Sequence, residues 1–320
     1  MGGCISVIVP IFNVETYLGD CLRSLQIQSD ADYEIILIDD GSTDGSPELA
    51  EAFRSNSDRC TLWRSSSNRG LGASRNKGVQ LARGDFVCFV DADDVVSPDF
   101  LACLRDRQKI TGASIVSGLI RRMTESGEVL GTRMIGDAPD VDPPLTVHER
   151  VLGLVNPSVA CARLYRIGLL RDDACLFRDR IPHEDLFFTY KVLRNRDTAD
   201  ADEAVYFWRH REDSLSARIT RAHVDVWLEL KRDTDAFLTA NQGSPREFAL
   251  AARRSLMFVN GVLRKADEQQ RLDVLEYLEG LSQEFGSLMM QDYDFVRHSE
   301  IKAIYLPKRL EKYLNDLGFS

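Results

Sequence analysis

Three carboxylates follow one short apolar run in this sequence. Residues 86–90 read FVCFV, and the next four residues, 91–94, read DADD. Like charges at this distance repel one another, so each carboxylate requires a partner. Asp91 and Asp93 stand two residues apart at the end of an expected strand, a spacing that can bring both to one Mg²⁺ or Mn²⁺ ion. The segment therefore predicts a cation-binding site.

A polar loop that leads into a helix is the plain alternative for this segment. Ser97 would cap that helix, and Pro98 would occupy its first position, where a missing N–H does no harm. This alternative accounts for those two residues but not for three acids at the end of a buried strand. The spacing alone leaves open whether Asp94 shares the ion with Asp91 and Asp93.

A second polar segment, DDGSTDG, spans residues 39–45 and also follows an apolar run. Asp39 and Asp40 suit recognition of a ribose or of the N–H edge of a base, because carboxylates accept hydrogen bonds. Glycine beside them lets the backbone approach a ligand. The same residue types also favour a plain turn followed by a helix N-cap.

A third segment, NRGLGASRN, spans residues 68–76 and opens an expected helix. Helix N-termini favour anions, and Arg69 and Arg75 would add positive charge there. A capped surface helix with solvated arginines is the alternative. The pattern is neither G-x-G-x-x-G nor a Walker A loop, so by itself it identifies no ligand.

Two later segments carry titratable groups. HEDLFF, residues 183–188, begins an amphipathic helix, and its two acids either stabilise the helix dipole or supply a general base. A cluster of positive and hydroxyl side chains then suits phosphate oxygens, with a solvated loop as the alternative. Its members are Arg209, His210, Arg211, Ser214 and Ser216.

Alternating strand and helix patterns position these segments. Apolar runs predict strands at 4–9, 33–38, 60–63 and 85–90, and helical spacing predicts helices at 15–28, 46–53 and 71–82. Strands separated by helices predict βαβ units, a largely parallel sheet and an α/β fold. Because ligands bind at the carboxyl ends of parallel strands, one crevice is expected to collect residues 10–13, 39–42 and 91–93.

The pattern changes after residue 110. We expect a hairpin around residues 125–127, a loop at 137–144, a helix at 184–193 and a strand at 204–210. Further helices are expected at 224–239, 245–265, 271–285 and 306–317. The sequence therefore predicts two domains, residues 1–220 with the candidate site and residues 221–320 as a helical region.

Composition excludes several classes of protein. The 320 residues carry a net charge of −10, which disfavours wide contact with nucleic acid. Seven scattered cysteines without a C-x-x-C pair indicate free thiols in a reducing compartment. Neither a signal peptide nor a membrane-spanning apolar stretch is recognisable, so we expect a cytoplasmic protein.

Taken together and in order, five segments resemble family 2 of the inverting glycosyltransferases, which have the GT-A fold, in its bacterial surface-polysaccharide type. They are SVIVPIFNVETYLGDCLRSLQIQS, YEIILIDDGSTDGS, NRGLGASRNKGVQLARGDFVCFVDADD, HEDLFF and YFWRHREDSLS. The stretch ACARLYRIGLL, residues 160–170, also looks like the family segment that precedes the acidic helix. Residues 221–320 carry no matching motif.

The resemblance implies roles in binding a nucleotide sugar. Asp93, with Asp91, would bind Mn²⁺ or Mg²⁺. Asp185 would be the catalytic base, and Glu184 would orient it or the acceptor. The nucleotide pocket would be lined by Pro10, Phe12 and Asn13, and the uracil or ribose would be held by Asp39, Asp40 and Asp91. Arg69 would lie near the base or the phosphates. The diphosphate or the acceptor would be steadied by Arg209, His210 and Ser214.

The activity implied by the resemblance is transfer of a sugar from a nucleotide-diphosphate sugar, with UDP as the expected nucleotide, to an acceptor hydroxyl. Inversion would follow from a single displacement, and the acceptor would be a glycan or a lipid-linked glycan. The C-terminal helices would serve the acceptor, a homo-oligomer or the inner membrane surface, where a basic amphipathic segment at 302–314 would make a peripheral contact. A helix packed against its own protein is the plainer alternative for this segment, and the one that we favour.

Two alternatives belong to other functional classes. A GT-A-like module that binds nucleotide sugars without turnover is one, although the acids at 91, 93 and 185 argue against it. A dinucleotide-dependent oxidoreductase is the other. Its glycine fingerprint is missing after the first strand, where residues 10–13 read PIFN.

Overall fold

The computed structural model describes residues 3–30, 32–133, 146–152, 159–172, 176–178, 184–211 and 219–280, with 288, 291, 292 and 296. The chain divides into two compact units, residues 1–135 with 159–211 and residues 136–158 with 212–320. The loop expected at 137–144, the helix expected at 306–317 and Ser214 lie outside the described residues.

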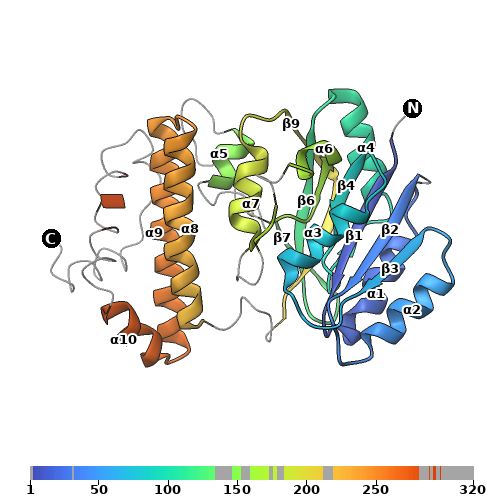
Figure 1. The fold of residues 1–320 in the computed structure, drawn as a ribbon, viewed down its shortest axis with the longest axis horizontal. Helices are drawn as coiled ribbons and strands as arrows, with labels where there is room; N and C mark the ends of the chain where they lie inside the picture. Colours follow the sequence, from blue (N-terminus) through green and yellow to red (C-terminus); the bar gives the residue numbers. More distant parts are fainter. Residues whose placement is uncertain are drawn as a thin grey trace. The chain divides into compact units, whose positions relative to one another are not determined.

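The first unit begins with four parallel strands in the spatial order β3-β2-β1-β4 (Figure 1). Their bounds are β1 Ile5–Ile11, β2 Tyr33–Asp39, β3 Cys60–Arg64 and β4 Phe86–Phe89. The helices between them are α1 Glu15–Gln26, α2 Ser46–Ser55 and α3 Leu71–Leu81. This confirms the predicted βαβ alternation, with bounds that differ by a few residues at each end.

The rest of the sheet is mixed in direction. Beyond β4 the order is β8-β6-β9-β5, and β7 pairs with β6. The pairings of β8 with β4 and β6, of β5 with β9 and of β7 with β6 are antiparallel, whereas β9 runs parallel to β6. The bounds are β5 Val95–Val96, β6 Ile115–Met123, β7 Val129–Arg133, β8 Arg163–Arg166 and β9 Thr198–Arg209. The α/β fold and the hairpin around 125–127 are confirmed, and the parallel arrangement is confined mainly to the first half.

The helix expected to start at Ser97 begins later. Helix α4 spans Phe100–Thr111, with Asp99 as its N-cap. Ser97 instead pairs with β9, because its N–H donates to the Val205 carbonyl at 2.9 Å and its hydroxyl accepts from the Val205 N–H at 3.3 Å. The long-range pairing with β9 therefore delays the start of the helix. Two short helices complete this unit, α6 Ile167–Leu170 and α7 Glu184–Leu193.

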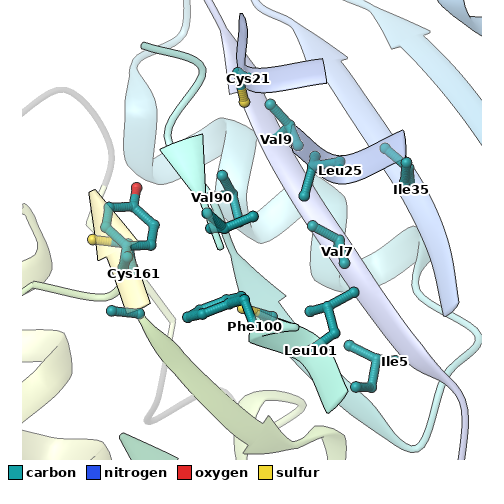
Figure 2. Packing of buried hydrophobic residues seen from close by; sticks show 14 of the residues in the cluster. Ile5, Val7, Val9, Cys21, Leu25, Ile35, Val90, Phe100, Leu101 and Cys161 are labelled. Atoms are coloured by element: carbon teal, nitrogen blue, oxygen red, sulfur yellow. The ribbon is translucent and has the colours of Figure 1, made fainter. Parts of the chain in front are cut away.

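Helices cover both faces of the sheet. Figure 2 shows the cluster on one face, where β1 packs against α1 and α4. The residues labelled there from these elements are Ile5, Val7, Val9, Cys21, Leu25, Phe100 and Leu101. Side chains alternate along a strand, so Ile8 points to the opposite face and contacts Gly78 of α3.

The second unit is helical among its described residues. Helices α8 Arg221–Ala240 and α9 Pro245–Glu268 lie side by side and are joined by four residues (Figure 1). Ser244 and Glu247 form a capping box at the start of α9. The other helices are α5 Val147–Leu152 and α10 Leu272–Gly280. No helix among the residues described here has the length and apolar character needed to cross a membrane.

The close packing of α3 on β1 gives a stability prediction. A Cβ at Gly78 would overlap Cγ2 of Ile8 and lie 3.1 Å from its Cδ1. Helix propensity alone favours Gly78→Ala by about 1 kcal/mol. Overpacking opposes it by about 1–3 kcal/mol, so we expect a lower free energy of unfolding.

Gly19 of α1 is the matched control, because an added Cβ there has no neighbour within 4 Å. Gly19→Ala should raise the free energy of unfolding by up to about 1 kcal/mol. Urea denaturation of both variants measures the difference. Equal stabilisation by the two substitutions would contradict the packing argument.

Candidate active site

Residues 10–13, 39–42 and 91–93 lie at neighbouring strand ends, as the sequence predicts. Strand β1 lies between β2 and β4, with Ile11 opposite Asp39 and Ile8 opposite Phe89. The residues after β1, β2 and β4 therefore reach the same edge of the sheet.

Hydrogen bonds join the loop after β1 to the loop after β2. Asn13 has a left-handed φ of 47°. Its N–H donates to the Ser42 hydroxyl at 3.1 Å, and its Oδ1 accepts from the Thr43 N–H at 2.8 Å. Pro10 lies within β1, and Phe12, the first residue after β1, is 46% exposed. The two loops thus form one surface with an exposed aromatic ring.

The two acids at the end of β2, Asp39 and Asp40, accept hydrogen bonds from backbone N–H groups. The buried carboxylate of Asp40 accepts hydrogen bonds from the N–H groups of Arg69, at 3.0 Å, and Gly70, at 2.8 Å. Oδ1 of Asp39 accepts from the Ser42 N–H at 3.0 Å. Asp40 therefore supplies the anion that the N-terminus of α3 favours, and it fixes the loop that carries Arg69.

Arg75 of α3 is a buried cation that connects two parts of the site. Its Nη2 donates to Oδ1 of Asp91 at 2.8 Å, and its Nη1 donates to Oε1 of Glu184. Burial alone would lower the pKa of Arg75, but the charges of Asp91, Glu184 and Asp185 raise it. The sequence placed Arg75 near an external anion, whereas the structure pairs it with the protein's own carboxylates.

The carboxylate of Asp94 accepts hydrogen bonds from two residues of strand β9. Its Oδ1 accepts from the Arg209 N–H at 2.8 Å, and its Oδ2 accepts from the Tyr206 hydroxyl at 2.6 Å. Burial raises the pKa of Asp94 well above its usual range, and the charges of Asp93 and Asp91 raise it further. Both carboxylate oxygens thus have partners on β9, and the side chain is almost fully buried.

The guanidinium of Arg209 donates hydrogen bonds to groups of the protein itself, whereas the family resemblance implies a contact with the diphosphate or the acceptor. Its Nε donates to the carbonyl of Asp93 at 2.8 Å, its Nη1 to the carbonyl of Glu125 at 2.6 Å and its Nη2 to Asp20 at 3.1 Å. Its guanidinium therefore joins the segment after β4, the hairpin tip and α1.

The neighbouring His210 is exposed, and its backbone N–H donates to the carbonyl of Met123 at 3.0 Å.

Asp91 and Asp93 remain the accessible acids of the cluster, with side chains 28% and 25% exposed. Burial and the charge of Asp91 raise the pKa of Asp93, although Arg211, at 3.2 Å, opposes this. No group of three or more potential metal ligands occurs among the described residues. Two carboxylates nevertheless suit Mg²⁺ or Mn²⁺, which commonly takes its other ligands from water and substrate phosphates.

Asp185 has the pKa of a group that exchanges protons near neutral pH. It lies in the first turn of α7 beside Glu184, whose carboxylate is buried against Arg75. Burial and the charge of Glu184 raise the pKa of Asp185 to about 7; Arg75 lowers it, and Asp91 raises it further. This matches the requirement for a general base at neutral pH.

Comparisons with known proteins find a glycosyltransferase family model and similar glycosyltransferases. The family model described as Glycosyl transferase family 2 matches residues 6–136. The chain is 28% identical over 241 residues to the putative glycosyltransferase EpsH of Bacillus subtilis, covering 74% of this chain and 70% of that one. It is 29% identical over 214 residues to the poly(ribitol-phosphate) beta-N-acetylglucosaminyltransferase TarS of Staphylococcus aureus, covering 65% of this chain and 36% of that one.

Solved structures show the same fold. Residues 1–349 of S. aureus TarS, crystallised in complex with UDP-GlcNAc, match with a TM-score of 0.68 and 20% identity, covering 99% of this chain and 88% of that one. At this identity the likeness establishes the shared fold. The sequence match spans 36% of the whole TarS protein.

The buried charge of Arg75 gives a second stability prediction. Arg75→Met should lower the free energy of unfolding by about 3–5 kcal/mol, because Glu184 and Asp91 lose their partner. The double variant Arg75→Met/Glu184→Met should recover part of this loss, since it also removes a buried carboxylate. Urea denaturation at neutral pH measures both.

Arg23 is the matched control, because it forms an exposed ion pair with Asp20 at 3.0 Å on the surface of α1. Arg23→Met should change the free energy of unfolding by less than about 1 kcal/mol. The assignment of Arg75 as a buried structural cation is wrong if the two single variants are equally stable.

Proposed function

We propose, on the premise that this chain belongs to glycosyltransferase family 2, that it transfers a sugar from a nucleotide-diphosphate sugar to an acceptor hydroxyl with inversion. Family membership makes the chain a glycosyltransferase. One observation carries the finer proposal: Arg75 bonds both to Asp91 at the strand edge and to Glu184 beside Asp185. A candidate base and the candidate donor edge therefore belong to one connected site.

UDP is the proposed nucleotide. Support comes from TarS, whose matching structure is a complex with UDP-GlcNAc. Pro10, Phe12 and Asn13 would line the base pocket, with the exposed ring of Phe12 available for stacking. Asp39 and Asp40, besides holding the loops, would present their remaining acceptor sites toward the uracil or ribose.

Asp91 and Asp93 would hold a Mn²⁺ or Mg²⁺ ion that accompanies the donor. A divalent ion bound there would neutralise charge on the departing diphosphate and act as a Lewis acid. Asp93 supplies a carboxylate whose negative form is disfavoured by burial and by Asp91, and a bound cation would relieve that repulsion. Arg69, His210 and Ser214 would add positive and hydroxyl groups around the phosphates.

Asp185 would take the proton from the acceptor hydroxyl as that oxygen attacks the anomeric carbon. The bond from this carbon to the diphosphate oxygen breaks in the same step, so the configuration inverts. Arg75 holds Glu184, and Glu184 in turn would orient Asp185 or the acceptor. General-base assistance of this kind contributes roughly 10²–10⁴-fold to the rate.

A glycan or a lipid-linked glycan is the proposed acceptor, in polysaccharide or glycoconjugate synthesis. One of the relatives named above supports a polymeric acceptor, since it is a poly(ribitol-phosphate) beta-N-acetylglucosaminyltransferase. The helical region 221–320 would serve acceptor binding, oligomer formation or peripheral contact with a membrane surface.

The pKa of Asp185 gives a pH prediction. A base must be deprotonated, so kcat/KM should fall about tenfold per pH unit below pH 7 and level off above it. The measurement is UDP release from UDP-GlcNAc with Mn²⁺ between pH 5.5 and 9, after a thermal-shift screen of UDP, GDP, CDP and dTDP sugars. If the screen selects another donor, that donor replaces UDP-GlcNAc.

Asp185→Asn should lower kcat by about 10²–10⁴-fold and leave the Kd for UDP within twofold. Turnover at the wild-type rate would rule out Asp185 as the base. A wild-type protein that binds UDP-sugars but releases no UDP would favour the non-catalytic binding module.

The metal assignment is tested by calorimetry with UDP. Asp93→Ala should weaken UDP binding in Mn²⁺ by at least about tenfold, because a carboxylate ligand is lost. Binding in EDTA should be unchanged, and Asp106→Ala, at an exposed position on α4, should change neither value. An Asp93→Ala variant with normal Mn²⁺-dependent binding would refute this assignment.

A further inference from the structure

Asn76 of α3 clamps a short segment that precedes helix α7. Its Nδ2 donates to the carbonyl of Phe177 at 2.9 Å, and its Oδ1 accepts from the N–H of the same residue at 3.0 Å. One side-chain amide thus satisfies both backbone groups of Phe177, as a neighbouring strand would. An amide suits this task because it carries one donor group and one acceptor group side by side.

Gly72 brings the same segment directly onto the backbone of α3. A Cβ at this position would overlap the carbonyl oxygen of Arg178 and lie 3.2 Å from Cβ of Phe177. Gly72 and Asn76 are four residues apart, so they occupy one face of α3. This face therefore fixes residues 177 and 178 at two points.

The ring of Phe177 carries this constraint to α7. It stacks on Phe188 with 3.7 Å between ring centroids and 19° between planes. Phe89 of β4 packs edge-on against both rings, at 5.4 and 6.3 Å. The guanidinium of Arg75 lies 5.3 Å from the centre of the Phe177 ring. Phe177 is therefore held between the buried cation and α7.

Phe188 lies three residues after Asp185, which is less than one turn along α7 and on a similar side of the helix. Arg75 already holds the first turn of α7 through Glu184. Phe188 also packs against Phe89 of β4 and, at 6.0 Å between ring centroids, against Tyr165 of β8. The Phe177–Phe188 stack is the contact by which the clamped segment joins this packing and helps to fix the direction of the helix axis.

We infer that Asn76 and Gly72 are positioning residues for Asp185, acting through the clamped backbone and stacked ring of Phe177. This inference rests on the proposed function, in which Asp185 is the base. Positioning matters because a displacement of about 1 Å at the reacting atoms can reduce a rate by roughly 10²-fold. Neither residue needs to touch the donor or the acceptor.

Two variants disturb the clamp in different ways. Asn76→Ala removes both hydrogen bonds, and Gly72→Ala pushes residues 177 and 178 away from α3. Each should lower kcat for UDP release from UDP-GlcNAc with Mn²⁺ by about 10–100-fold. KM and the Kd for UDP should stay within twofold. Asn76→Asp, which retains the acceptor and loses the donor, should fall between wild type and Asn76→Ala.

Gln28 provides a control of the same chemistry. Its Nε2 donates to the Ser97 carbonyl at 2.7 Å, and its Oε1 accepts from the Leu101 N–H at 3.0 Å, so it clamps backbone elsewhere in this unit. Gln28→Ala should lower Tm about as much as Asn76→Ala but leave kcat unchanged. Equal losses of kcat in the two variants, or normal kcat in Asn76→Ala and Gly72→Ala, would overturn the inference.

Hydrogen exchange separates this inference from the proposed function. In the Asn76→Ala and Gly72→Ala proteins, amide exchange over residues 184–188 should rise at least tenfold, and in Gln28→Ala it should not. If the wild-type protein turns over no nucleotide sugar, the proposed function fails. Amide exchange over residues 184–188 then remains the test of whether Asn76 and Gly72 hold α7 in place. Unchanged exchange in both clamp variants overturns the inference whatever the activity.

Discussion

One buried cation organises the site. The guanidinium of Arg75 is almost fully removed from water, and that removal is costly unless opposite charges surround it. Asp91 and Glu184 supply those charges, one from the end of β4 and the other from the start of α7. The same interaction fixes the distance between the two halves of the candidate active site. It also lowers the pKa of Asp185, which would otherwise lie still further above its usual range.

Carboxylates that look alike in the sequence perform different tasks because they differ in burial and partners. Asp40 caps α3 through two backbone N–H groups, and Asp94 anchors the segment after β4 to β9. Asp91 and Asp93 stay partly exposed and keep capacity for an ion. A carboxylate that accepts hydrogen bonds from the protein still carries further acceptor sites, and the partial exposure of Asp91 and Asp93 leaves theirs accessible to an ion.

The arginines divide in the same way. Arg75 and Arg209 donate their hydrogen bonds to groups of the protein, and these bonds connect elements that lie far apart in the chain. An acid-rich strand end is therefore stabilised by internal cations. The positive charge of Arg209 and the family resemblance suggested a contact with the diphosphate or the acceptor. Its partners, two backbone carbonyls and one carboxylate from three other segments, are absent from its own neighbourhood in the sequence.

Local sequence patterns predict the order of elements from β1 to β4, the hairpin between β6 and β7, the helices α7 to α9 and the edge of the sheet at which the polar segments meet. These follow from apolar periodicity and turn residues, which act over a few positions. The tertiary structure alone decided the directions of β8 and β9, the late start of α4 and the partners of Arg75, Asp94 and Arg209. The bonds from Arg75 to Glu184 and from Tyr206 to Asp94 span 109 and 112 residues. Partners so far apart are chosen by three-dimensional packing, which local patterns do not encode.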